Sequence, residues 1–273
     1  MQVSVVIPTM PGREAMLAKL ISTIPKKYEV IVVDDMDILL AAKRNKGARL
    51  ADGEYLFFVD DDNYLEEGAI EAAVELASQP GVGVVGFMAC YHDKKDTVAD
   101  GGSKRNYLTG FTKGINTNAH WPTLSKEPYE VDEIANAFMM HEDLFFELGG
   151  LDAKNFPIDL DEADFCRKVR NKGLKVMVNP KALCYHNSIT YSWIPDFRRP
   201  INAYCMGRHR VCYQRNCNSH LRFGLYLVFF LPIFVCFYSL SLLHRKKPSL
   251  IFHFLKGVWD GLRNSPSHPY TKG

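Results

Sequence analysis

The order of apolar segments in the first 90 residues limits the possible folds more than any other feature of this sequence. Apolar runs at residues 3–7, 29–33 and 55–59 have the composition of buried parallel strands. Helical patterns separate them, at about residues 14–24 and 38–51. Strands that alternate with helices in this way predict an α/β domain with a mostly parallel sheet and right-handed crossovers.

Later segments extend the pattern to residue 186. The stretch GVGVVG at residues 81–86 has the glycines of a dinucleotide site, but it follows a helix and enters a strand, so it predicts no nicotinamide or flavin. Residues 91–130 are rich in Gly, Lys, Asn and Thr, which predicts loops and short strands around the mouth of a site. The other expected elements are a helix to about Ser78, a strand at 82–89, a strand and helix within 133–152, a helix ending at Gly173 and a strand ending at His186.

Polar residues follow the carboxyl ends of the first three strands, where sheets of this class collect their ligands. Thr9, Asp34 and Asp60 occupy these positions. Asp60, Asp61 and Asp62 bring together three carboxylates, which repel one another unless a cation or protons intervene. Asp60 and Asp62 supply the oxygen ligands that Mg²⁺ or Mn²⁺ prefers. The alternative is an acidic turn that caps the next helix.

The formal net charge of +2 conceals two different parts of the chain. Residues 198–273 hold twelve Lys or Arg and one acidic residue, whereas the first 197 residues hold 21 basic and 30 acidic residues. The first part is typical of a soluble acidic enzyme and the second of a segment that meets an anionic surface.

Cysteine usage and the N-terminal sequence bear on the compartment. The seven cysteines form no CxxC pair, and Cys205, Cys212 and Cys217 lack the histidine partners of a zinc site. We expect reduced thiols in a cytoplasmic compartment. The sequence begins with a strand-like segment, so we expect no export signal.

An uncharged run of 21 residues, 223–243, suggests contact with a membrane. As a helix it would be about 32 Å long, which matches the roughly 30 Å hydrocarbon core of a bilayer. Basic residues flank both ends, so the positive-inside rule gives no orientation. Pro232 at the centre favours a bent or re-entrant pair of half-helices as the alternative to a single span. A buried core helix is a further alternative, and a single span and a monotopic arrangement both stay open.

The rest of the tail also suits a membrane interface. Residues 198–216 are basic and aromatic. Helical spacing in the following segment predicts an apolar helix face, and basic helices with such a face bind membrane interfaces. Nucleic-acid binding is the competing use of this charge, but the uncharged run beside it favours lipid. The predicted face consists of Phe252, Leu255, Val258, Trp259 and Leu262.

Six segments in a fixed order give the sequence a family resemblance. It resembles family 2 glycosyltransferases of the inverting GT-A type and is rhamnosyltransferase-like. The resemblance implies a nucleotide-diphospho-sugar transferase fold, with a mostly parallel sheet flanked by helices. It also implies a nucleotide-sugar-binding half at 1–90, an acceptor-binding and catalytic half at 91–197, and a membrane-associated helical tail at 198–273. The segments are VSVVIPT, EVIVVDD, KRNKGARLADGEYLFFVDDD, ELGGLD, DEADFCRKVRNKG and CYH, within about residues 3–186.

The resemblance implies a site for a nucleotide-diphosphate sugar and a divalent cation. The cation, Mn²⁺ or Mg²⁺, would stabilise the charge that develops on the diphosphate leaving group. Its expected ligands are Asp60, Asp62 and His186, although His186 has the alternative of an ordinary loop residue. Imidazole is a better ligand for Mn²⁺ than for Mg²⁺. The expected contacts with the nucleotide sugar are Pro8, Thr9, Asp34, Arg44, Asp60 and Asp61.

An acidic stretch aligns with the catalytic base of the family. Its sequence is Asp161, Glu162, Ala163, Asp164, and Glu162 takes the place of the base although the first two acids are swapped relative to the commonest form. A carboxylate there would deprotonate the acceptor hydroxyl as the sugar C1 is attacked from the face opposite the diphosphate, which implies inversion. Asp161 and Asp164 remain rivals for the role, and capping of the helix is the structural alternative.

Two departures from the family bear on function. The segment between Asp35 and Lys43 is shorter than usual, which weakens the expected role of Arg44. The Gln-x-x-Arg-Trp element of processive synthases is absent, so we expect transfer of a single sugar.

The expected function is therefore a metal-dependent glycosyltransferase in polysaccharide biosynthesis, at the cytoplasmic membrane face. Its expected partners are a nucleotide-sugar donor, a glycan or lipid-linked acceptor and membrane lipid, without nucleic acid. The alternatives are a sugar nucleotidyltransferase and an inactive membrane-tethered sugar-nucleotide-binding protein.

Overall fold

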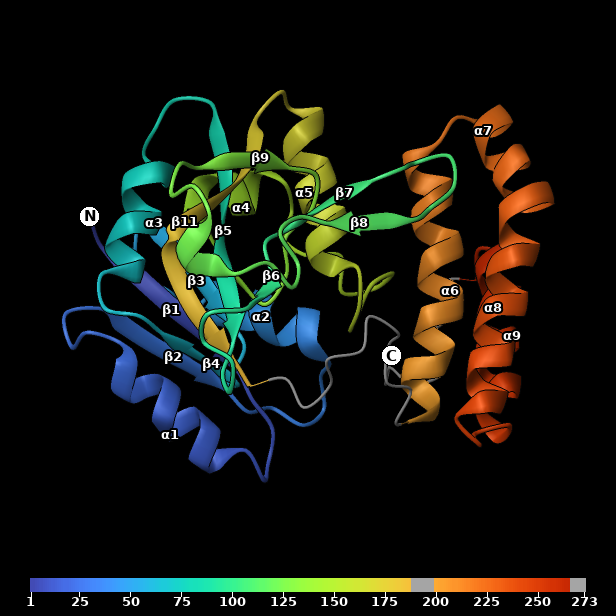
Figure 1. Ribbon diagram of the computed structural model, residues 1–273, viewed down its shortest axis with the longest axis horizontal. Coiled ribbons are helices and arrows are strands. Elements are labelled where there is room, and N and C mark those ends of the chain that lie inside the picture. The colour runs from blue at the N-terminus through green and yellow to red at the C-terminus, as the bar shows by residue number, and fades with distance from the viewer. Residues whose placement is uncertain (188–198, 266–273) are drawn as a thin grey trace. The chain divides into compact units, whose positions relative to one another are not determined.

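Two compact units make up the computed structural model (Figure 1), which describes residues 1–187 and 199–265. Each unit has its own hydrophobic core. The first unit comprises residues 1–104, 113–151 and 162–187, and the second comprises 105–112, 152–161 and 199–265.

A sheet of nine strands forms the centre of the first unit within the described residues, and its main path runs β2-β1-β3-β10-β5-β11-β4. β1 pairs in parallel with β2 and β3, as the sequence predicted. β5 and β11 are also parallel to each other. The long strands are β1 Val3–Pro8, β2 Glu29–Val33, β3 Tyr55–Val59, β5 Val82–Tyr91 and β11 Lys175–His186.

One strand in the middle of the sheet runs against its neighbours. β10, Ala137–His141, pairs antiparallel with both β3 and β5. The sequence predicted a strand here but not its direction, because an apolar run has the same composition whichever way it runs. Three short strands also pair antiparallel: β4 Asn63–Leu65, β6 Val98–Asp100 and β9 Tyr129–Val131.

Helices cover both faces of the sheet (Figure 1). On one face, Leu20 of α1 and Ile70 of α3 enter the same core as Val5 and Phe57 of the strands. On the other face, Phe145 of α4 contacts Phe58. The helices are α1 Glu14–Thr23, α2 Leu40–Ala48, α3 Ala69–Ala77, α4 Glu142–Glu147 and α5 Asp161–Asn171. The predicted GT-A type of α/β architecture, a mostly parallel sheet between helices, is thereby confirmed.

A glycine on α2 allows that helix to lie close to the sheet. A Cβ added at Gly47 would lie 2.3 Å from Cγ1 of Val6 and 3.2 Å from Cγ2 of Val33. A larger residue would push α2 away from the strand ends, where the residues that follow β1 and β2 lie.

Short elements fill residues 91–130, as the sequence predicted. Besides β6 and β9, they are β7 Ser103–Arg105, β8 Thr112–Gly114 and a 3₁₀ turn at Trp121–Thr123. β7 and β8 form a separate two-stranded ribbon, and its tip belongs to the second unit.

The second unit consists mainly of helices (Figure 1). α6 and α9 lie side by side with their backbones in close contact. A Cβ at Gly207 would lie 2.3 Å from the carbonyl oxygen of Phe254, and one at Gly257 would lie 2.1 Å from that of Tyr204. The helices are α6 Pro200–Cys217, α7 His220–Leu225, α8 Leu231–His244 and α9 Ser249–Leu262.

The apolar run forms one continuous helix through α7, a π-helical turn at Tyr226–Phe230, and α8. A re-entrant pair of half-helices, the alternative suggested by Pro232, is not what forms. The wider π turn makes room for the proline ring, which would clash with the carbonyl four residues earlier in a regular helix. This helix, His220–His244, is long and apolar enough to cross a membrane, and 22% of its most apolar window is buried.

The predicted apolar face of α9 needs one correction. Phe252, Leu255, Trp259 and Leu262 are exposed, as predicted. Val258 is buried, because it packs into the core of the second unit.

Candidate active site

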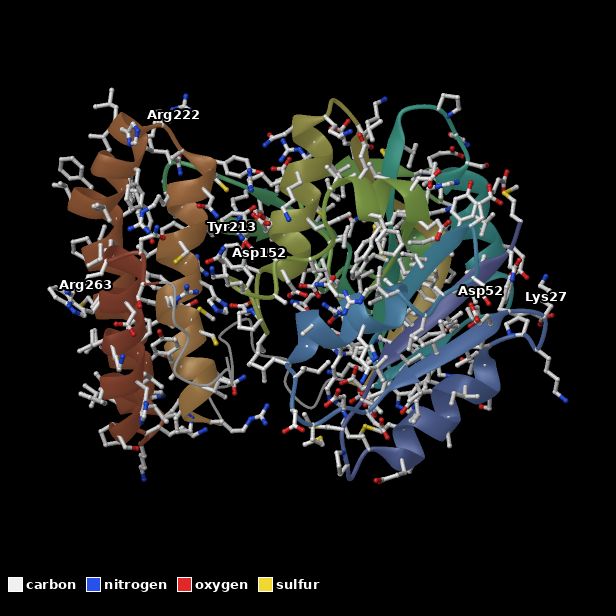
Figure 2. All side chains as sticks on the ribbon, turned by 180° about the vertical axis from the view of Figure 1, so that it is seen from behind. Lys27, Asp52, Asp152, Tyr213, Arg222 and Arg263 are labelled. Atoms are coloured by element: carbon white, nitrogen blue, oxygen red, sulfur yellow. The ribbon has the colours of Figure 1, made fainter. Side chains whose placement is uncertain are left out.

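The candidate site lies at the edge of the sheet where β1 and β3 end. The backbone N–H of Thr9 donates to the carbonyl of Val33 at 3.0 Å, which joins the ends of β1 and β2. Lys43 Nζ on α2 donates to the carbonyl of Thr9 at 2.6 Å. Lys27 and Asp52, labelled in Figure 2, mark the opposite edge, where β2 and β3 begin. We call the group Asp60, Asp61, Asp62 and Glu162 the carboxylate edge.

Asp61 points inward and anchors the loop after β3. Its Oδ2 accepts from Thr9 Oγ1 at 2.6 Å, and its Oδ1 lies 3.0 Å from Nε of Arg13. Burial raises the pKa of Asp61, while the Thr9 hydrogen bond and the charge of Arg13 act against that rise. With both oxygens engaged, Asp61 stabilises the loop that carries its two neighbours.

Asp62 lies between Arg13 and His186. Its Oδ2 is 2.6 Å from Nη2 of Arg13, and its Oδ1 is 3.5 Å from Nε2 of His186. The pairing of β4 with β11, which places His186 opposite Asn63, accounts for this proximity. Burial alone would raise the pKa of Asp62, but the hydrogen bond and charge of His186 and the charge of Arg13 outweigh it, so the pKa is lowered. Burial would lower the pKa of His186, yet Asp62 raises it.

A buried arginine joins Asp60 to Glu162. Arg44 has a side chain 0% exposed, with Nη2 at 2.7 Å from Asp60 Oδ1 and Nη1 at 2.7 Å from Glu162 Oε1. The pKa of Asp60 is raised by burial, with Arg44 acting against the rise and the charges of Asp62 and Glu162 adding to it. This placement favours a structural role for Arg44, in which it holds two carboxylates, rather than the expected contact with a nucleotide.

The structure separates the three candidate bases at the start of α5. Asp164 is buried and holds Arg167 Nη2 at 2.8 Å and Lys168 Nζ at 3.4 Å, so it is committed to its own helix. Asp161 is fully buried. Glu162, with 13% of its side chain exposed, meets Arg44 beside Asp60.

The remaining expected donor contacts lie at the same edge. Pro8 is the last residue of β1 and pairs in register with Val33. Thr9 is buried against Asp61, whereas Asp34 is exposed immediately after β2. The residues predicted from the sequence therefore lie at the same edge of the sheet. Their contacts with a nucleotide-sugar donor stay predictions.

Sequence reasoning missed three residues of the site. Arg13 lies in the PTMPGRE loop and was not assigned to the aspartates. Asp100 at the end of β6 and Asn136 before β10 are linked by a 3.5 Å hydrogen bond, and the Asn136 carbonyl accepts from the Asp60 N–H at 3.1 Å. Burial raises the pKa of Asp100, and the charge of Glu162 adds to the rise. Asn136 has a positive φ of 65°, a conformation that asparagine tolerates better than most residues. A single asparagine in the sequence does not reveal that its backbone adopts this conformation.

Asp62 of the carboxylate edge and His186 beside it offer ligand atoms that fit a divalent cation shared with a bound substrate. Among residues 1–187 and 199–265, no three His, Cys, Asp or Glu side chains are placed together to hold a metal ion. Asp62 and His186 nevertheless direct an oxygen and a nitrogen toward each other at 3.5 Å. A cation such as Mg²⁺ usually takes one or two carboxylates from the protein and completes its shell with water and substrate phosphates. Two protein ligands therefore suffice, and Mn²⁺ accepts the imidazole better than Mg²⁺ does.

Comparisons with known proteins agree with this fold. Residues 39–126 match the model of the family described as Glycosyl transferase family 2, and the predicted family resemblance is confirmed over these residues. This match identifies a glycosyltransferase domain in that part of the chain, as the sequence predicted. No curated protein sequence matches the chain.

Solved structures give the same result for the fold. GalNAc-T7, solved with UDP, GalNAc and Mn²⁺, aligns with a TM-score of 0.56 at 15% identity, over 82% of this chain and 56% of its own. The mannosyltransferase PcManGT from Pyrobaculum calidifontis, solved with GDP-Man and Mn²⁺, aligns with a TM-score of 0.56 at 13% identity, over 97% and 88%. S. aureus TarS aligns with a TM-score of 0.51 at 17% identity, over 85% and 43%. The chain thus spans about half the length of the first and third of these proteins.

Proposed function

We propose that this protein is an inverting, metal-dependent glycosyltransferase that moves one sugar from a nucleotide-diphosphate sugar to a lipid-linked glycan acceptor. The observation that carries the proposal is that two pairs of side chains converge at one edge of the sheet. Asp62 lies against His186, and Arg44 joins Asp60 to Glu162. The family match and the relatives solved with nucleotides and Mn²⁺ support it. We assign donor binding to residues 1–90, acceptor binding and catalysis to 91–197, and membrane contact to 198–273.

The donor diphosphate is proposed to bind where Asp62 and His186 converge. A divalent cation bound there would supply the positive charge that stabilises the departing diphosphate. Arg13 now holds Asp62 Oδ2, so its guanidinium must release that oxygen or share it when the donor site is filled. Pro8, Thr9 and Asp34, at the ends of β1 and β2, border the space for the nucleoside.

Glu162 is proposed as the base. Its carboxylate takes the proton of the acceptor hydroxyl while the hydroxyl oxygen forms a bond to C1 of the sugar and the bond from C1 to the diphosphate breaks on the opposite face. Arg44 fixes the position of this carboxylate, because its other terminal nitrogen is held by Asp60. Orientation of a base in this way supports a rate gain of about 10²- to 10⁴-fold.

The second unit is proposed to bind the cytoplasmic face of a membrane without crossing it. The helix His220–His244 exposes a stripe of apolar side chains, and α9 exposes another. α6, which lies beside α9, carries Arg208, Arg210 and Arg215. Charged side chains such as these are costly to place in the hydrocarbon core of a bilayer. An in-plane arrangement buries the exposed apolar side chains and leaves these charges at the interface. The apolar side chains are Leu221, Leu225, Val228, Phe229, Ile233, Phe237, Leu240, Leu243, Phe252, Leu255, Trp259 and Leu262.

Two further features support this location. Basic residues flank the long helix, and Figure 2 labels Arg222 near its start and Arg263 just after α9. Each such charge near an anionic surface contributes about 1 kcal/mol. All seven cysteines are free thiols, as is usual in a reducing compartment.

Donor hydrolysis tests the proposed activity. The full chain is incubated with a panel of nucleotide-diphosphate sugars, and release of nucleoside diphosphate is measured with Mn²⁺, with Mg²⁺ and with a chelator. We expect release from one donor class, only with a divalent cation. Absence of release from every donor would leave an inactive binding protein, and release of pyrophosphate from a nucleoside triphosphate with a sugar phosphate would identify a nucleotidyltransferase.

Vesicle flotation tests the proposed location. Phe229 and Ile233, both exposed on the long helix, are changed to Glu together, and Ile21→Glu on the exposed side of α1 is the control. We expect the double variant to lose vesicle binding and the control to keep it. Equal flotation of all three proteins contradicts membrane contact through this helix.

A further inference from the structure

Arg13 neutralises the same carboxylate that a cation would need. Its Nη2 lies 2.6 Å from Oδ2 of Asp62, and its Nε lies 3.0 Å from Oδ1 of Asp61. The other oxygen of Asp62 faces His186 at 3.5 Å. Because an arginine and a divalent cation are both attracted by the negative charge of Asp62 and repel each other, they compete for this side chain.

The two ion pairs of Arg13 differ in how easily they are exchanged. The side chain of Asp61 is 2% exposed, and Thr9 Oγ1 holds its other oxygen at 2.6 Å. The side chain of Asp62 is 20% exposed, so water and a ligand have access to it. A carboxylate that solvent reaches gives up a partner at lower cost than a buried one does. The contact with Asp61 is therefore the fixed one, and the contact with Asp62 is the exchangeable one.

The backbone of Arg13 is fixed while its side chain stays accessible. The Arg13 carbonyl accepts from the N–H of Leu17 at 2.9 Å, which ties it to the first turn of α1. The side chain is 32% exposed. Its polar contacts within the described residues, with Asp61, Asp62 and Met16, use Nε and Nη2 and leave the two N–H groups of Nη1 for another acceptor. A small rotation of the guanidinium about its bond to Asp61 is enough to take Nη2 away from Asp62.

The chemistry of the guanidinium selects the acceptor that replaces Asp62. Arginine presents its N–H donors in a rigid fork that matches the oxygens of a phosphate, and such charge-assisted hydrogen bonds are among the strongest in proteins. A neutral sugar hydroxyl would not compensate for the loss of an ion pair. The proposed donor brings a diphosphate to Asp62, so phosphate oxygens arrive at the place where Arg13 loses its carboxylate.

We propose that Arg13 is an exchangeable counter-ion, which neutralises Asp62 while no donor is bound and transfers this bond to the diphosphate of the nucleotide sugar when the donor binds. The proposal rests on the proposed function, because it assigns a further binding residue for the donor diphosphate. Arg13 thereby opposes a cation that binds alone and favours a cation that binds together with the diphosphate. The nucleotide strengthens cation binding by the same factor as the cation strengthens nucleotide binding.

Binding of Mn²⁺ to Arg13→Gln tests the proposal. The affinity of the full chain for Mn²⁺ is measured by electron paramagnetic resonance, alone and with whichever of UDP, GDP, ADP and CDP the wild type binds best. Arg13→Gln should bind Mn²⁺ alone about tenfold more tightly than the wild type, because the competing charge is gone. The nucleotide should then strengthen Mn²⁺ binding by a factor about tenfold smaller than in the wild type. Arg49→Gln removes an exposed arginine outside the site and should match the wild type.

A second comparison leaves Arg13 unchanged, since Arg13→Gln also loses the contact with Asp61. Asp62→Asn removes the charge that holds Nη2. In a chelator, this variant should bind the same nucleoside diphosphate several-fold more tightly than the wild type, through the released guanidinium. Addition of Arg13→Gln to Asp62→Asn should abolish the gain. Calorimetry on the wild type, the two single variants and the double variant gives the coupling between the two side chains.

Each of four results would overturn the proposal. The first is an affinity of Arg13→Gln for Mn²⁺ alone that is no higher than that of the wild type. The second is an equal effect of the nucleotide on Mn²⁺ binding in both proteins. The third is that Asp62→Asn gains no nucleotide affinity, or gains it equally with and without Arg13, which would attribute the gain to the lost negative charge alone. The fourth is that the wild type binds none of the four nucleoside diphosphates.

Donor hydrolysis separates this proposal from the proposed function. If Mn²⁺ and the nucleotide bind with a coupling that depends on Arg13, but no nucleotide sugar is hydrolysed, the proposed activity fails and the role of Arg13 stands. If hydrolysis requires a divalent cation and the coupling is the same in Arg13→Gln, the role of Arg13 fails and the activity stands.

Discussion

Arginine side chains have different neighbours at the carboxylate edge of the first unit and in the second unit. At the edge, Arg13 and Arg44 each bond two carboxylates. In the second unit, Arg105 and Arg210 both donate to the carbonyl oxygen of Gly110, and each guanidinium lies against an aromatic ring. The two regions use the same side chain in different ways, so a count of arginines says little about the ligand of either.

The difference shows how partners define a site. The guanidiniums at the edge leave Asp62 Oδ1 facing a histidine, an arrangement that suits a cation. In the second unit, Arg210 meets a backbone carbonyl and an aromatic ring instead. The ligand class expected at the edge follows from its carboxylate oxygens, which are the ligands that a divalent cation prefers.

The largest expected effect is loss of activity in Asp62→Asn. The amide keeps the size of the side chain but removes the charge that a cation requires. Metal-dependent turnover should therefore fall to the background rate. This is a loss of about 10³-fold or more, which corresponds to an increase of several kcal/mol in the activation barrier. Steady-state donor hydrolysis measures it. Asp52→Asn at the opposite edge of the sheet is the control and should be fully active, and comparable activity in both variants argues against the cation site.

Glu162→Gln should separate chemistry from binding. Loss of the base should lower sugar transfer by about 10²- to 10⁴-fold, whereas the affinity for the nucleotide sugar should stay near that of the wild type. Transfer to an acceptor and donor affinity by calorimetry are the two readouts. If Glu162→Gln transfers sugar at the normal rate, the base is Asp161 or Asp164 and the assignment made from the Arg44 contact is wrong.

Arg44→Met should lower stability, because it leaves Asp60 and Glu162 without their shared counter-ion. Removal of one partner from a buried ion pair costs about 3–5 kcal/mol. Urea denaturation gives the free energy of unfolding. The exposed Arg49→Met on the next turn should change it by less than about 0.5 kcal/mol. A loss in Arg44→Met no larger than that of its control would show that the two carboxylates do not depend on Arg44.

His186→Gln should have the smallest effect, and that effect should depend on pH. The lowered pKa of Asp62 means that its contribution is present above the ordinary Asp value and is lost as pH falls through the lowered pKa. The raised pKa of His186 means that its contribution is present below the ordinary His value and is lost as pH rises through the raised pKa. The free energy of unfolding of the wild type should therefore exceed that of the variant by about 1 kcal/mol between about pH 4 and pH 6.5, and by less on either side.

The pH experiment is done in a chelator so that no metal contributes. Urea denaturation at about pH 5.5 and about pH 8.5 spans the two regimes. The exposed His220→Gln is the control and should show no comparable dependence. A difference between wild type and His186→Gln that grows toward alkaline pH would contradict the ion pair.

The sequence predicted the fold and the position of the carboxylate edge because both follow from local patterns. Asp60 to Asp62 come directly after an apolar run, and parallel strands place their carboxyl ends at one edge. The direction of β10 could not be predicted, since it depends on which neighbours the strand finds. The Arg44 contacts could not be predicted either, because Glu162 is 118 residues away in sequence.

The contact of Arg210 was beyond sequence reasoning for a related reason. Arg210 lies 100 residues from Gly110, whose carbonyl it bonds. A basic tail predicts an anionic surface, but it does not say which groups each arginine contacts after folding.

Direct binding of Mn²⁺, followed by electron paramagnetic resonance, tests the central claim that the carboxylate edge holds a cation together with a nucleoside diphosphate. The wild type should bind Mn²⁺ weakly alone and much more tightly when the matching nucleoside diphosphate is present, and Asp62→Asn should bind no more Mn²⁺ than the nucleotide does by itself. Equal nucleotide-dependent binding of Mn²⁺ by the wild type and Asp62→Asn would contradict the account.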